Sequence, residues 1–95
     1  MERAEILHEA EKNVCGQREQ DYGTPEDNFK RIASLWGDYL DYPVSPSDVA
    51  AMMVLLKVAR IHGSEAGSID SWVDIAGYAA CGAEVMIRPD TEVHG

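Results

Sequence analysis

The stretch Asp70-Ser-Trp-Val-Asp-Ile-Ala-Gly-Tyr78 places two carboxylates at the head of an otherwise apolar, small-residue segment. Asp70 and Asp74 are four residues apart, so on a helix they share one face, with Cβ atoms roughly 5–6 Å apart. Two like charges in this position repel each other, and an apolar neighbour raises the cost of ionising both. A positive group is therefore expected opposite them. The candidates are Lys57, Arg60 and a divalent metal.

Capping signals and apolar spacing predict three more helices before this one. Thr24 as N-cap and Pro25 at the first helical position predict the start of the second helix. Ser45, with Asp48 three positions later, predicts the start of the third, and Gly63 is expected to close it. The four predicted helices span about residues 2–18, 25–40, 49–61 and 69–87.

The expected fold is all-α. Short connections favour antiparallel neighbours, which predicts a four-helix up-down bundle. The third and fourth helices hold more apolar surface than one 95-residue core can bury, so we expect a homo-oligomer, a dimer or larger, to complete the bundle. Residues 1–88 are expected to form a single helical domain, and residues 89–95 a flexible polar tail.

Composition limits the classes of partner. The net charge of −9, from 8 Lys and Arg against 17 Asp and Glu, disfavours duplex nucleic acid, whose phosphates attract basic surfaces. A small phosphorylated ligand remains compatible, because a few local cations can reverse the field in a cleft. Cys15 and Cys81 lack metal-ligand spacing and are expected to be reduced thiols. Neither an export signal nor a membrane-spanning run is expected, so the predicted location is cytoplasmic, without a membrane partner.

An up-down topology would bring the polar residues of two helix junctions to one end of the bundle. The group, with the glycine that lies among these residues, is Asp21, Tyr22, Gly23, Glu26, Asn28, Lys57, Arg60, Asp70 and Asp74.

Two interpretations of this group stay open. In the first, Arg60–Asp70 and Lys57–Asp74 are salt bridges between helices that set their register. In the second, Asp70 and Asp74 are ligands of Mg²⁺, which prefers one or two protein carboxylates plus phosphates and waters. Lys57 and Arg60 would then bind phosphate oxygens of a nucleotide.

Other residues of the group would contact the substrate under the second interpretation. Tyr22 and Trp36 are candidates for stacking on a base, although both residue types more often belong to a core. Asn28 is a further substrate-binding candidate. The expected partner is a small-molecule nucleotide.

Three motifs carry a resemblance to known proteins. Asp-Tyr-Gly-x-Pro-Glu-x-Asn-Phe at 21–29, Lys-x-x-Arg at 57–60 and the quoted stretch at 70–78 resemble those of small phage and prophage helical proteins of unassigned function. More distantly, their order is similar to that in the all-helical MazG-like nucleotide pyrophosphohydrolases. The resemblance covers about residues 17–85. Asp74 matches the last acid of that group's Glu-x-x-Asp signature, while Ser71 stands where its Glu is expected.

The resemblance implies a magnesium-dependent enzyme that cleaves a (deoxy)nucleoside triphosphate to monophosphate and pyrophosphate. Asp70, Asp74 and Glu26 are then the catalytic candidates, with Glu26 or Asp70 orienting the attacking water. If the chain is phage-encoded, it would act in the host cytoplasm. The alternatives are a non-enzymatic oligomer that binds a nucleotide or a host protein, and a structural helical adaptor.

Overall fold

The described part of the chain is all-α, as predicted. The computed structural model describes residues 1–16, 23–63 and 68–87, and over these ranges it contains helices and no strand. The helices are α1 (Arg3–Cys15), α3 (Pro25–Leu40), α4 (Pro46–Gly63) and α5 (Ser68–Ile87). Over these ranges no helix is long and apolar enough to cross a membrane. The predicted tail, 89–95, lies outside the described residues.

The helix starts follow the capping residues that the sequence indicated. The Thr24 hydroxyl accepts a hydrogen bond of 3.2 Å from the Asp27 amide at the start of α3. At the start of α4, the Ser45 hydroxyl accepts from the Asp48 amide, and the Asp48 carboxylate accepts from the Ser45 amide. This reciprocal capping box starts α4 at Pro46, three residues earlier than predicted.

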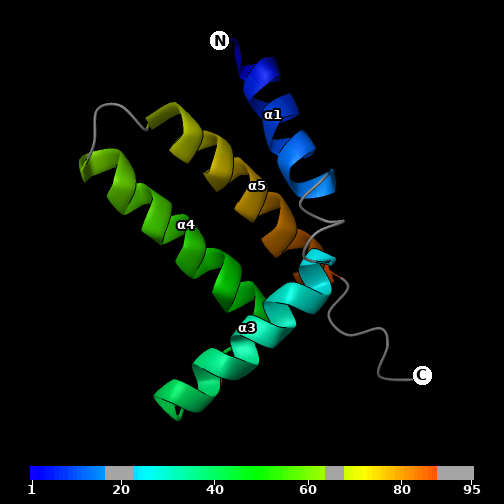
Figure 1. The fold of residues 1–95 in the computed structure, drawn as a ribbon, viewed down its shortest axis with the longest axis vertical. Coiled ribbons are helices and arrows are strands. Elements are labelled where there is room, and N and C mark those ends of the chain that lie inside the picture. The colour runs from blue at the N-terminus through cyan, green and yellow to red at the C-terminus, as the bar shows by residue number, and fades with distance from the viewer. Residues whose placement is uncertain (17–22, 64–67, 88–95) are drawn as a thin grey trace.

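Figure 1 shows how the helices are arranged. Helices α4 and α5 run antiparallel, side by side, and α1 packs along α5. Helix α3 crosses this pair obliquely, near the start of α4 and the end of α5 (Figure 1). The antiparallel α4–α5 pair is what a short connection favours, whereas the oblique crossing of α3 departs from the even spacing of an up-down bundle.

The core lies where α3 crosses the other two helices. Its buried side chains come from α3, α4 and α5: Phe29, Ala33, Val49, Ala50, Cys81 and Val85. Trp36 packs against this cluster, as the core interpretation of that residue expected.

Small residues let the helices approach closely. A Cβ added at Gly77 would lie 3.0 Å from Cγ1 of Val14, and one added at Gly82 would lie 2.9 Å from the Cβ of Ala50. The sequence indicated that small residues of the last helix admit another helix. At these two positions the close neighbours are α1 and α4 of the same chain.

The core is small for the apolar content of the chain. Val49 is the largest side chain that is fully buried within the described ranges. Many large apolar side chains are exposed, among them Leu35, Tyr39, Leu55 and Trp72. The surplus that predicted an oligomer is therefore present on the surface of the single chain.

Candidate functional site

A cavity of about 260 Å³ opens between the four helices. Its described walls come from the end of α1, the start of α3, and the middle of α4 and of α5. Most of the lining is apolar, including Val14, Phe29, Met53 and Tyr78. A concave, mainly apolar surface with a few polar groups is typical of a small-molecule site.

Two aromatic rings line one side of the cavity. The rings of Phe29 and Tyr78 are stacked, with centroids 6.2 Å apart and planes inclined by 28°. Phe29 is buried and Tyr78 half-buried, so the Tyr78 ring is more accessible to a ligand. The two rings therefore give the cavity an aromatic, apolar part of its wall, against which a planar ligand could pack.

Among the described residues, amide and carboxylate side chains also border the cavity, namely those of Asn13, Asn28 and Asp74. Asn28 lies in the first turn of α3, downstream of the Thr24 cap, and is half-buried. An amide side chain both donates and accepts hydrogen bonds, and a carboxylate accepts them. The cavity can therefore recognise a ligand that carries donors and acceptors on its edge.

The Asp74 carboxylate has a cationic partner. The Lys57 ammonium lies 2.9 Å from the Oδ2 atom of Asp74, with the two side chains 13% and 30% exposed. A positive group was expected opposite the carboxylates of α5, and for Asp74 this group is Lys57. Lys57 thus occupies a position that a divalent cation bound to Asp74 would also take.

The second expected pair does not form in the structure. Arg60 and Asp70 are both exposed, and no ion pair joins them. Neither residue borders the cavity. Of the residues expected together at one end of the bundle, Asn28 and Asp74 border the cavity, whereas Arg60 and Asp70 do not.

The remaining predicted site residues are distributed as follows. Glu26 is half-buried in the first turn of α3 and does not border the cavity. Asp21 and Tyr22 lie outside the described residues. Within the described ranges, no three His, Cys, Asp or Glu side chains are grouped so that they could hold a metal ion.

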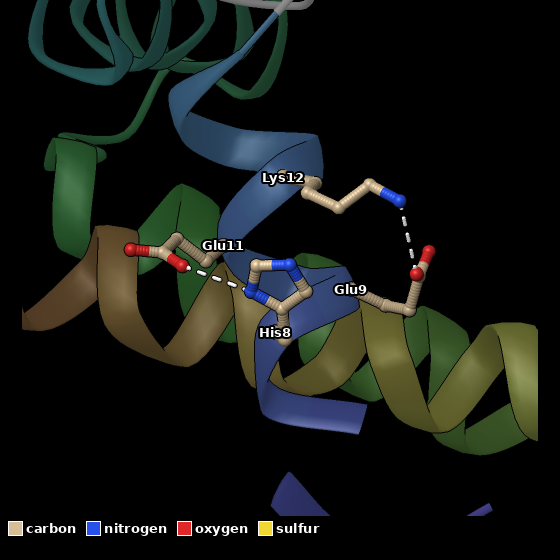
Figure 2. Close-up of polar contacts among 4 residues, drawn as sticks. All are labelled: His8, Glu9, Glu11 and Lys12. Atoms are coloured by element: carbon tan, nitrogen blue, oxygen red, sulfur yellow. Dashed lines mark hydrogen bonds and ion pairs between the residues drawn. The ribbon is translucent and has the colours of Figure 1, made fainter. Parts of the chain in front are cut away.

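The glutamates of α1 do not border the cavity, and two of them lie close to a histidine and a lysine of the same helix. Figure 2 shows His8 directed at Glu11 and Lys12 at Glu9, each pair three residues apart on the helix. The distances are 3.3 Å for His8 Nδ1 to Glu11 Oε1 and 3.1 Å for Lys12 Nζ to Glu9 Oε2. Surface pairs of this kind contribute little to stability.

Sequence reasoning missed several residues of the cavity. Asn13, on α1, gave no signal, because a single polar residue on a largely polar helix is unremarkable. Phe29 and Tyr78 were part of the quoted motifs, but nothing in their spacing indicated that they stack. Their contact depends on the oblique crossing of α3 over α5.

The chain belongs to a family of small domains without an assigned activity. Residues 5–86 match the family described as Domain of unknown function (DUF6378). This span includes every described wall of the cavity.

Two phage proteins are similar to the chain. It is 43% identical over 84 residues to the Gene 55 protein of Mycobacterium phage D29, covering 88% of this chain and 55% of that protein. It is 48% identical over 88 residues to the Gene 55 protein of Mycobacterium phage L5, a match that covers 92% of this chain and 55% of that protein. The chain thus spans about half the length of these relatives. No solved structure matches it. The expected resemblance to small phage proteins is confirmed; the MazG-like relationship stays a prediction.

Proposed function

We propose that this domain binds a small ligand with a planar ring, of the nucleoside or nucleotide class, in the cavity between its four helices. The observation that carries the proposal is the combination of the Phe29–Tyr78 aromatic wall with the polar groups of Asn28 and Asp74 around one cavity. A nucleobase has two apolar faces and an edge of donors and acceptors. Those are the properties that this lining complements.

The size of the cavity limits how much of the ligand is enclosed. Pockets that bury drug-sized ligands measure about 300–1,000 Å³. At about 260 Å³, this cavity suits a base or a nucleoside better than a whole triphosphate. Any phosphates would extend out of the cavity, and Lys57 and Arg60 are the candidate cations for them.

Hydrolysis is a separate step, which the MazG-like resemblance implies. Magnesium-dependent cleavage by Asp70, Asp74 and Glu26 would require a cation to replace Lys57 at Asp74, or to join it there. Releasing Lys57 would in turn free its ammonium for a phosphate oxygen. Binding is therefore the function that the geometry supports best, and hydrolysis stays a prediction.

Thermal denaturation with a panel of nucleosides and nucleotides tests the proposal. A ligand at 100 times its Kd stabilises a folded protein by about 2.7 kcal/mol, which raises Tm by several degrees. Ribose 5-phosphate and inorganic pyrophosphate, which lack the ring, should leave Tm unchanged. If no ring-bearing compound raises Tm or gives a heat of binding at millimolar concentration, the proposal is wrong.

Two variants locate the site. Asn28→Ala removes a polar group from the cavity wall and should raise the Kd about tenfold, which corresponds to a loss of roughly 1.4 kcal/mol of binding free energy. Ser34→Ala removes a hydroxyl from an exposed position of the same helix and should leave binding unchanged. Repeating the titrations with Mg²⁺, and measuring pyrophosphate released from triphosphates, separates hydrolysis from binding alone.

A further inference from the structure

The outer side of α4 carries a regular stripe of exposed residues. Starting at Asp48, exposed positions follow at intervals of four, three, four and three residues: Asp48, Met52, Leu55, Ala59 and His62. This alternation keeps the five side chains on one face of the helix and is the spacing of a helix that packs along another helix. We call these five residues the α4 stripe.

The α4 stripe is apolar in the middle and polar only at its ends. Leu55, at its centre, is 66% exposed, and Leu56 and Val58 beside it are exposed as well. Between Asp48 and Ala59 the only charged residue of α4 is Lys57, which is directed at Asp74 and away from the stripe. In a chain with 17 acidic residues, a helix face without a charge over three turns indicates a covered surface.

The polar side chains at the two ends of the stripe indicate what covers it. Asp48 lies in the first turn of α4 and His62 in the last. If a second copy packs antiparallel, Asp48 of each copy lies near His62 of the other, and the two helix dipoles oppose each other favourably. A parallel arrangement would instead place the two Asp48 carboxylates together. The stripe is thus self-complementary in the way that a two-fold interface requires.

We propose that the α4 stripe is the interface of an antiparallel homodimer, centred near Leu55. The excess of exposed apolar surface predicts an oligomer, and this proposal states which surface the two copies share. It does not depend on the ligand cavity. A standard interface buries about 800 Å² on each partner, which is more than one helix stripe supplies. The exposed side chains of Leu56 and Val58, which flank the stripe on α4, are expected to extend the interface.

Matched arginine substitutions test the surface. Leu55 and Leu35 are 66% and 62% exposed, on α4 and α3 respectively, so neither change should remove a core contact. Sedimentation equilibrium at micromolar concentration should give twice the chain mass of 10.5 kDa for wild type and for Leu35→Arg, and the single mass for Leu55→Arg. Circular dichroism of all three proteins checks that the helices are retained.

Disulfide trapping tests the orientation, in a Cys15→Ser background because Cys15 is an exposed free thiol. Positions 51 and 59 are equally far from Leu55, on opposite sides. In an antiparallel pair, a mixture of Ala51→Cys and Ala59→Cys chains should form the mixed disulfide. A parallel pair would cross-link Ala59→Cys to itself, because positions 51 and 59 are about 12 Å apart along a helix.

Each unfavourable outcome overturns a stated part of the proposal. A wild-type monomer at micromolar concentration excludes the homodimer and leaves a different protein as the occupant of the stripe. Equal effects of Leu55→Arg and Leu35→Arg exclude this face. Self-linking of Ala59→Cys excludes the antiparallel orientation. Loss of ligand binding alone would bear only on the function proposed for the cavity.

Discussion

The Lys57–Asp74 ion pair offers a quantitative test of how the polar end of the cavity is held together. We consider the change Asp74→Asn, which keeps the shape of the side chain and removes its charge. The partners lie 2.9 Å apart, and their side chains are 13% and 30% exposed. The pair thus lies between the exposed limit of about 0–1 kcal/mol and the buried limit, where removing one partner costs about 3–5 kcal/mol.

We therefore expect Asp74→Asn to lower the free energy of unfolding by about 1–3 kcal/mol. For a domain of this size, each kcal/mol lowers Tm by roughly 4–8 °C. Lys57→Met should destabilise by a similar amount, since it leaves the carboxylate without its cation. The double variant should recover much of the loss, because no uncompensated charge then remains.

The assay is a double-mutant cycle by urea denaturation, with every protein at one concentration because self-association would shift apparent stability. The matched control is the cycle of Asp70→Asn and Arg60→Met, whose residues are exposed and make no ion pair with each other. Its coupling energy should be near zero, against about 1–3 kcal/mol for the Lys57–Asp74 cycle. Equal coupling in the two cycles would refute the reasoning.

Two further predictions concern helix packing and capping. Gly82→Ala should lower the free energy of unfolding by about 1–3 kcal/mol, because the added Cβ would lie 2.9 Å from that of Ala50. Adding Ala50→Gly should recover part of this loss. As a control, Gly63→Ala has open space around its new Cβ and should leave stability unchanged or raise it. Thr24→Ala should cost about 1 kcal/mol in urea denaturation, because the Asp27 amide loses its acceptor, while Thr24→Ser should be nearly neutral. Equal stability of Thr24→Ala and wild type would show that this cap contributes nothing.

The sequence by itself determined the helices. Their existence and most of their ends follow from local interactions: Thr24 and Ser45 cap the helices that they precede, and α5 begins within one residue of the predicted start. Such interactions involve residues three or four positions apart, so they can be identified in the chain before it folds. The positive partner for the acids of α5 was also predictable, as was the surplus of apolar surface.

Only the tertiary structure decided which of these features meet. The sequence left Lys57, Arg60 and a metal open as partners of the two acids; the packing of α4 on α5 pairs Lys57 with Asp74 and leaves Asp70 exposed. The cavity likewise depends on the oblique crossing of α3, which brings Phe29 onto Tyr78. Crossing angles arise from side-chain ridges and from close approaches such as Gly82 on Ala50, between residues far apart in the chain. Because no local pattern encodes those contacts, the sequence indicated the residues of the site but not their arrangement.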